Sequence, residues 1–301
     1  MAIQKITIED AEYPKNLKNI HVPPAQLYVN GDLLPQDVHA VALVGSRRAS
    51  VYGIEACETL AFELAMRGVT VVSGMARGID SAAHRGALKA KGRTIAVMGS
   101  GHGYIYPPEN KDLYARIAES GAVVTEYADD TPPLREYFPQ RNRIISGLSL
   151  GVVIVEAARK SGALITANFA LEQGREVFAV PGKISSTTSA GTHDLIKDGA
   201  RLVQGAEDIL DELRLVELER PAGIDARDAQ QQATGASLYR ALSEIEKKVY
   251  EALSDEPRYV DDIAKETCVD AKRLSHILLN LELKKVIRQL PGKQYIRSER
   301  G

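Results

Sequence analysis

The chain has 301 residues, of which 44% are hydrophobic, and this length suits one large domain with a second, smaller one. Its formal net charge of -2 excludes a protein that binds nucleic acid through positive charge spread over its whole surface, so any such site has to be a local patch. Cys57 and Cys268 have no cysteine nearby, which excludes a disulfide framework and argues against a zinc site. No apolar run approaches the roughly 18 residues of a membrane helix, so we expect a cytoplasmic protein without membrane contact.

The first 37 residues are predicted to be a lead-in to the next domain. Several prolines interrupt this segment, and Asn30-Gly31-Asp32 is a strong turn signal. Residues 26–29 indicate a short edge strand. We therefore expect residues 1–37 to form no separate domain.

Short apolar runs alternate with helix-length segments across residues 38–212. The expected strands are residues 41–44, 69–72, 94–98, 122–125, 151–155, 176–180 and 201–203. The expected helices between them are residues 52–66, 79–91, 109–120, 162–172 and 192–197. A glycine follows each helix in the position of a left-handed cap. This alternation predicts an α/β fold, a Rossmann-like doubly wound domain whose mostly parallel sheet is covered on both faces.

The stretch Phe138–Gly147 is polar at its start and comes just before an expected core strand. We expect this polar stretch to be a loop. Loops beside core strands often carry functional residues. Its side chains that can donate hydrogen bonds to phosphate oxygens are Gln140, Arg141, Asn142 and Arg143. The Phe138 ring offers a face to a base or a sugar. The alternative is that the two arginines cap a helix and pair with nearby carboxylates.

Glycine clusters follow the carboxyl ends of several expected strands, where open α/β sheets bind their ligands. Gly45, Ser46 and Arg47 place a flexible backbone, a hydroxyl and a guanidinium at the start of a helix, which favours an anion. Ser161 and Gly162 begin another helix and would extend the same groove. The alternatives are a tight turn with solvated arginines in the first place and a simple helix cap in the second.

Signals for catalysis and nucleotide cofactors are weak. Neither GxGxxG nor GxxxxGK[ST] occurs, which discounts a nicotinamide dinucleotide and P-loop ATP hydrolysis. Asp80 and His84 could form an acid–base pair, but a helix N-cap and a packed histidine are the favoured interpretation. Glu126 and Glu156 end strands near the proposed groove and could act as general bases or orient arginines.

The remainder of the chain predicts a linker and a small helical domain. Residues 213–236 offer little to bury and are predicted to be the linker. Residues 237–301 predict three helices, one between Leu238 and Leu253, then 260–267 and 271–284, before a hairpin of 286–290 and 294–297. This pattern is typical of a winged helix. Its basic residues gather in the third helix and the hairpin, which favours duplex DNA, while protein contact stays open as the alternative.

The chain carries a set of motifs in a characteristic order. They are Val44–Arg47, Ser73–Asp80, Ala83–Leu88, Tyr106–Asn110, Phe138–Ile145, Ser161–Ala167 and Phe178–Gly182. Together they resemble the DNA-processing protein A family (DprA, also called Smf). The resemblance runs from about Tyr13 to Leu210, and the tail is similar to the winged-helix domain of many members.

The resemblance implies a non-catalytic cytoplasmic protein without a cofactor that binds single-stranded DNA independently of sequence. It also implies protection of incoming strands in natural transformation, loading of the RecA recombinase and a homodimer. The family's GSR and FPxRNR motifs fall on Gly45, Ser46, Arg47, Phe138, Arg141, Asn142 and Arg143. Arg135 occupies the basic position before the second motif, and Lys111 is a weaker correspondence.

Two other functions compete with this one. A nucleotide-modifying enzyme of the phosphoribohydrolase type would have a similar fold, but the PGGxGTxxE motif of that family does not occur here. A regulator that binds duplex DNA through its winged helix would lose its binding once the tail was removed. A single-strand binder would instead keep most of its binding, because a basic groove and an aromatic ring lie in the larger domain.

Overall fold

The structure is a computed structural model that describes residues 3–215, 244–254, 257–267, 269–283, 287–290 and 294–297. The chain divides into two compact units, Met1–Gly223 and Ile224–Gly301. Most of the predicted linker, along with Cys268 and the predicted turn at Pro291–Lys293, lies outside the described residues. Within the described ranges, no helix has both the length and the apolar character needed to cross a membrane.

The described part of the first unit contains a nine-stranded sheet with the order β1-β2-β6-β5-β4-β3-β7-β8-β9. Its strands are β1 Gln4–Thr7, β2 Gln26–Gly31, β3 Ala40–Gly45, β4 Thr70–Ser73, β5 Thr94–Val97, β6 Ala122–Thr125, β7 Gly151–Glu156, β8 Glu176–Ala179 and β9 Arg201–Leu202. The strands from β3 to β9 pair in parallel, whereas β1 and β2 are antiparallel additions. The central strands are apolar and buried, as a sheet covered on both faces requires.

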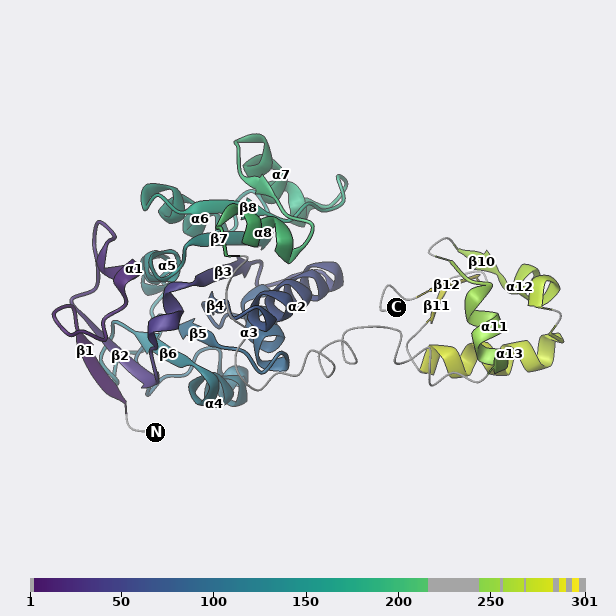
Figure 1. Ribbon diagram of the computed structural model, residues 1–301, viewed down its shortest axis with the longest axis horizontal. Coiled ribbons are helices and arrows are strands. Elements are labelled where there is room, and N and C mark those ends of the chain that lie inside the picture. The colour runs from purple at the N-terminus through teal and green to yellow at the C-terminus, as the bar shows by residue number, and fades with distance from the viewer. Residues whose placement is uncertain are drawn as a thin grey trace. The chain divides into compact units, whose positions relative to one another are not determined.

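Helices cover both faces of this sheet, which confirms the predicted α/β, Rossmann-like fold (Figure 1). One face packs against α1 Lys15–Lys18, α5 Tyr137–Leu148 and α6 Ala163–Glu172. The other packs against α2 Val51–Met66, α3 Ile79–Lys89, α4 Lys111–Ser120 and α8 Ala206–Glu212. The short helix α7 Ala190–Lys197 follows β8, and the single turns are η1 Pro35–Val38, η2 Pro108–Asn110 and η3 Thr187–Ser189.

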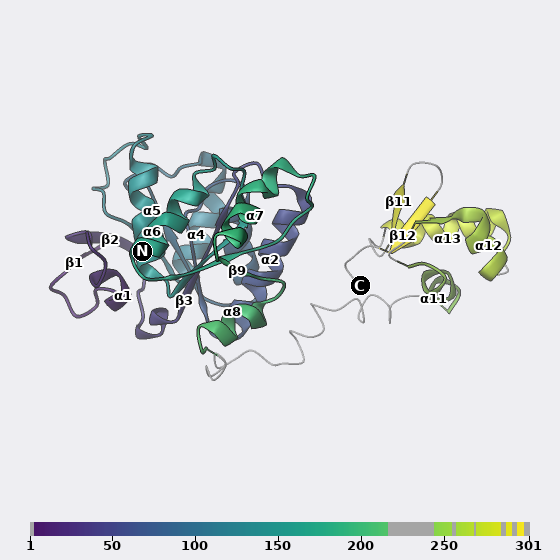
Figure 2. The ribbon, with the colours of Figure 1, turned by 90° about the horizontal axis from the view of Figure 1, so that it is seen from above.

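The N-terminal segment is part of the first unit. The strand β2 pairs with both β1 and β6, so the prediction that it is an edge strand is wrong, and β1 occupies the edge instead. Tyr13 and Leu17 are buried in the core that α5 shares, and the Tyr13 hydroxyl donates to the Pro24 carbonyl at 2.7 Å. Figure 2 shows β1, β2 and α1 together at one end of this unit.

The stretch Phe138–Gly147 is helical, so the prediction of a loop there is wrong. It forms α5, in which Arg141, Ile144, Ile145 and Leu148 recur at helical spacing and are buried. Pro139 sits in the first turn, where its missing N–H costs no hydrogen bond. The polar first half of the helix conceals this periodicity in the sequence.

The topology of the sheet places a ligand site between β3 and β7. From β3 the chain builds β4, β5 and β6 on one side of the sheet, then returns to build β7, β8 and β9 on the other. Ligands of open α/β sheets bind at the carboxyl ends of strands at such a reversal. Here the two strand ends meet, because the Ser46 N–H donates to the Glu156 carbonyl at 2.7 Å.

The second unit has the helix and strand order of a winged helix. Its described elements are α11 Glu244–Glu251, β10 Arg258–Tyr259, α12 Val260–Thr267, α13 Ala271–Leu283, β11 Ile287–Leu290 and β12 Gln294–Arg297. The strands form a small sheet in the order β10-β12-β11, of which sequence analysis missed β10. Val249, Ile263 and Leu278 belong to its core. Leu238 and Leu242, predicted to mark the first helix, lie outside the described residues.

Candidate functional site

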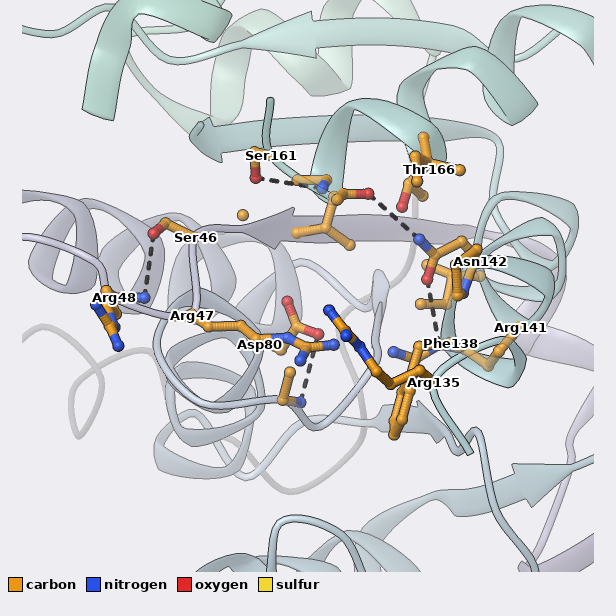
Figure 3. A pocket seen from close by; sticks show the side chains of 18 of the residues that line it. Ser46, Arg47, Arg48, Asp80, Arg135, Phe138, Arg141, Asn142, Ser161 and Thr166 are labelled. Carbon is orange, nitrogen blue, oxygen red and sulfur yellow. Dashed lines mark hydrogen bonds between the residues drawn. The ribbon is translucent and has the colours of Figure 1, made fainter. Parts of the chain in front are cut away.

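A groove of about 790 Å³ opens at the carboxyl ends of β3 and β7 (Figure 3). Most of the predicted site residues line it: Gly45, Ser46, Arg47, Arg135, Phe138, Arg141, Asn142, Ser161 and Gly162. Lys111, Gln140 and Arg143 do not line it. The groove therefore brings together segments that lie more than 100 positions apart in sequence.

The turn after β3 is held by a carboxylate from β7. Glu156 Oε2 accepts hydrogen bonds from the backbone N–H and the hydroxyl of Ser50, at 3.0 and 2.9 Å, and Ser50 in turn caps α2 by accepting from the Gly53 N–H. Glu156 thus positions the start of α2. The turn leaves the side chains of Arg47 and Arg48 exposed at the groove.

Arg141 forms part of the floor of the groove. Its side chain is buried, with 3% of the residue exposed, and its Nη1 donates to the carbonyls of Gly74, at 2.7 Å, and Val97. Burial lowers the pKa of Arg141 to about 10, so the guanidinium is still charged at neutral pH. The predicted DNA contact by Arg141 stays a prediction, and this arginine also holds the ends of β4 and β5 at the base of the groove.

Asp80 supplies the only carboxylate among the described residues that line the groove. It lies in the first turn of α3, whose N-cap is Gly78, so the prediction that Asp80 is the N-cap is wrong. Burial raises its pKa, and the positive charges of Arg141 and Arg47 act in the opposite direction. Asp80 therefore offsets part of the positive charge beneath the groove.

Arg143 points away from the groove and forms an ion pair with Glu126, with 2.7 Å between Nη2 and Oε2. Both side chains are largely buried, so this pair holds α5 to the end of β6. This ion pair agrees with the alternative of a structural role for Arg143, in which Glu126 orients an arginine. Lys111 and Gln140 are exposed outside the groove lining, Lys111 at the start of α4.

Phe138 is half-buried at one wall of the groove, where two groups flank its ring. The guanidinium carbon of Arg47 lies 5.3 Å from the ring centroid, and the Tyr106 ring lies 5.5 Å away, centroid to centroid. This arrangement combines a cation with two aromatic rings. A planar group that entered the groove could stack on an aromatic ring and would lie near the positive charge of Arg47.

The opposite wall is the start of α6. The Ser161 hydroxyl accepts from the Ala163 N–H at 3.3 Å, and the Asn142 amide donates to the Gly162 carbonyl at 3.4 Å. Lys160 and Thr166 also line the groove, as does Arg48 beside Arg47, although none of the three is among the predicted site residues. The basic position directly before Ser161 is the signal that could have identified Lys160.

The charge of the groove is strongly positive. Its lining cations are Arg47, Arg48, Arg135, Arg141 and Lys160, against the single carboxylate of Asp80. A local basic patch of this kind agrees with a chain whose net charge is only -2. The described residues contain no group of acidic, histidine and cysteine side chains that could hold a metal ion.

His84 takes no part in the groove. It is fully buried, and its Nδ1 lies 2.7 Å from the Thr94 hydroxyl oxygen. Burial, with the nearby positive charges of Arg141 and Arg85, lowers the pKa of His84 to about 3. The interpretation of a packed, neutral histidine is confirmed, and no hydrogen bond joins His84 to Asp80 in the described part of the chain.

Comparison with known proteins places the chain in a family. The family model of DNA recombination-mediator protein A matches residues 4–214. The chain belongs to this family. A second model, the DprA winged helix domain, matches residues 232–293, which supports the winged-helix prediction for the second unit.

Relatives of the DprA family share substantial identity with the chain. The DNA processing protein DprA of Bacillus subtilis is 45% identical over 212 residues, 70% of this chain and 71% of its own length. Protein Smf of Synechocystis sp. is 36% identical over 318 residues, 98% of this chain and 80% of its own length. Against Protein Smf of Escherichia coli, 50% identical over 67% of this chain, the match spans 54% of that protein.

Two solved DprA structures share the fold. The Streptococcus pneumoniae protein matches with a TM-score of 0.67 and 40% identity, over 73% of this chain and 76% of that one. The Helicobacter pylori protein, which has a described single-stranded DNA binding mode, matches with a TM-score of 0.62 and 32% identity, over 70% of this chain and 96% of that one. Both similarities agree with the architecture of the first unit.

Proposed function

We propose that this protein binds single-stranded DNA, independently of sequence, in the groove between β3 and β7. The observation that carries this proposal is the lining of five cations and one carboxylate beside the rings of Phe138 and Tyr106. Single-strand binders combine a positive groove for phosphates with aromatic faces on which bases stack. The described binding mode of the Helicobacter pylori relative supports the same ligand.

The Phe138 ring at the wall of the groove favours a single strand over a duplex. A base can lie against the Phe138 ring only when it is free of its neighbours in a stacked duplex. No part of the proposed contact requires a particular base, since phosphates meet Arg47 and Arg48 and every base has a face that can stack. Binding should therefore depend on charge and salt much more than on sequence.

Membership of the DprA family supports a wider role for the bound strand. We infer that the protein acts in the cytoplasm as a homodimer, protects incoming DNA in natural transformation and loads RecA onto it. We further infer that it does so as a binding protein and not as an enzyme, without a cofactor. The contacts of Glu156 Oε2 with Ser50 and of His84 Nδ1 with the Thr94 hydroxyl support a structural use of both side chains.

Binding measurements on the full-length protein test the primary proposal. Fluorescence anisotropy with a labelled oligothymidylate and with a matched duplex should show preference for the single strand. The Arg47→Ala variant should lose most of that binding. Arg116→Ala provides a matched control, because Arg116 is exposed on α4 and does not line the groove. Equal binding by Arg47→Ala and the control would place the DNA site elsewhere.

The inferred role with RecA has its own test. On single strands covered by a single-strand-binding protein, the wild-type chain should speed RecA filament formation, measured as the onset of ATP hydrolysis by RecA. The Arg47→Ala variant should fail to do so. If DNA binding is present and RecA assembly is unchanged by the wild-type protein, the loading role is wrong while the binding proposal stands.

A further inference from the structure

The loop between β8 and α7, residues Pro181–Ser189, carries the most exposed large hydrophobic side chain in the described ranges. Ile184 is 97% exposed. A single exposed apolar residue is ordinary on a protein surface. Two features set Ile184 apart from other exposed apolar residues. Its loop is anchored at the base, and the loop leaves the same edge of the sheet as the groove.

Several contacts anchor the base of the β8–α7 loop. The Tyr52 hydroxyl donates to the Pro181 carbonyl at 2.9 Å, which ties the loop to the first turn of α2. His193 Nε2 lies 3.3 Å from the Gly182 nitrogen, and a Cβ at Gly182 would collide with the Ser189 side chain. The backbone therefore enters and leaves the loop at set positions, and Ile184 projects from between them.

The β8–α7 loop continues the line of the groove. The strand β8 pairs in parallel with β7, so the loop leaves the same carboxyl edge of the sheet as the groove. Arg48 lies at the end of the groove away from Phe138 (Figure 3), and α2, whose first turn contacts the loop, begins three residues after Arg48. Strands are spaced by about 4.8 Å, so the step from β3 to β8 is about 10 Å, a distance that a strand leaving the groove can cover.

The chemistry around the loop is basic, hydroxylic and apolar. Lys183 and Arg48 are exposed, and so are Val51 (72%) and Tyr52 (51%) at the start of α2. Residues 181–193 contain no acidic side chain and several serines and threonines. A surface with cations for phosphates and apolar groups for bases, continuous with a basic groove, fits a single strand of DNA better than it fits a protein partner.

We propose that the DNA strand leaves the groove past Arg48 and continues onto the β8–α7 loop, where Lys183 contacts a phosphate and Ile184 packs against a base. This inference rests on the proposed single-strand binding. It adds a second contact region to the strand's path and predicts that the loop matters only for strands long enough to extend beyond the groove.

Oligothymidylates of two lengths, about 4 and about 16 nucleotides, test this path with the full-length protein. Ile184→Ser should weaken binding of the longer strand about fivefold to tenfold and leave the shorter strand unaffected. Lys183→Ala should weaken the longer strand and lower the slope of its log affinity against log salt by about 0.7, the value for one phosphate contact in a single strand.

Matched controls lie on other parts of the same unit. Leu171 is 61% exposed near the end of α6, and Lys5 is exposed on β1, so Leu171→Ser and Lys5→Ala should bind both strands as the wild type does. Unchanged binding of both lengths by the loop variants overturns the inference and would leave Ile184 for a protein contact. Equal weakening of both lengths also overturns it, since the loop would then act on the groove itself.

The failure of this inference and the failure of the proposed function have different outcomes. If Arg47→Ala loses both strands while the loop variants keep both, groove binding stands and the extended path is wrong. If the wild-type protein binds neither strand, the groove proposal fails and takes the extended path with it.

Discussion

The contrast between Arg47 and Arg141 is the sharpest prediction from the groove. Both arginines line it, yet Arg47 is exposed whereas Arg141 is buried and bound to two backbone carbonyls. Arg47→Ala should therefore abolish a DNA contact and spare the fold. Arg141→Ala should weaken the fold itself, because two carbonyls and the Asp80 carboxylate would lose their buried cationic neighbour.

The expected magnitudes follow from these environments. A hydrogen bond to a charged group contributes about 1.5–3 kcal/mol, so Arg47→Ala should weaken single-strand binding roughly 10- to 100-fold. Removing its contact with the Phe138 ring should lower the free energy of unfolding by about 1 kcal/mol at most. Arg141 makes two buried hydrogen bonds from a charged group, each contributing about 1.5–3 kcal/mol, so Arg141→Ala should lower the free energy of unfolding by several times more.

Salt dependence gives an independent measure of the same prediction. The exposed cations of the lining are Arg47, Arg48, Arg135 and Lys160, and each phosphate contact in a single strand contributes about 0.7 to the slope of log affinity against log salt. For a strand confined to the groove the wild-type slope should be near -3, and Arg47→Ala should bring it to about -2.

Anisotropy titrations at several salt concentrations and urea unfolding of each variant make the comparison. An Arg47→Ala protein that unfolds as easily as Arg141→Ala would refute the division between an exposed contact and a buried support. An Arg47→Ala protein that keeps the wild-type slope of log affinity against log salt would also refute it.

Three further predictions concern the supports of the groove. Gly74→Ala should be destabilising, because a Cβ there would lie 2.5 Å from the Arg141 guanidinium, and urea unfolding should show a lowered midpoint. Arg143→Gln should lower the free energy of unfolding, through loss of the buried Glu126 pair, yet leave the DNA salt slope within error of wild type; a reduced slope would contradict the structural role of Arg143. The folded-state pKa of His84 is about 3, below its usual 6.5, so its contribution to stability is present above pH 6.5 and is lost as pH falls toward 3; His84→Gln should show a smaller decline in urea stability between pH 7 and pH 5 than wild type.

The sequence was sufficient for the parallel strands of the sheet and for the edge where the groove opens, but not for β1 at the antiparallel end. Apolar runs such as residues 151–155 are buried on both faces, which is a local signal. The predicted left-handed glycine follows the helix at Gly68, Gly174 and Gly199, whereas Gly121 is extended and Lys91 takes the left-handed conformation before Gly92. The order of the parallel strands then brings Ser46 beside Glu156. Local pattern and topology rules together therefore locate the switch point.

Other features depend on contacts that no local pattern contains. The helix α5 was predicted as a loop because Arg141 occupies a position of its buried face, where an apolar residue would have revealed the period. The guanidinium can be buried there only because the carbonyls of Gly74 and Val97, from distant strands, accept its hydrogen bonds. The ion pair of Arg143 with Glu126 likewise cannot be predicted until the positions of β6 and α5 are known.

The presence of Asp80 in a groove for an anion has a physical reason in the same contacts. Arg47 and Arg141 repel one another, and the effect of Arg47 on Arg141 is to lower its pKa further. A buried guanidinium without a nearby negative charge would be strongly destabilising, and Asp80 supplies that charge from beneath. The cations of the groove therefore have two tasks: Arg141 is compensated and shapes the floor, whereas Arg47, Arg48, Arg135 and Lys160 lie around it with charge left for phosphate. Such a division lets a nearly neutral chain present a strongly basic site without destabilising the sheet beneath it.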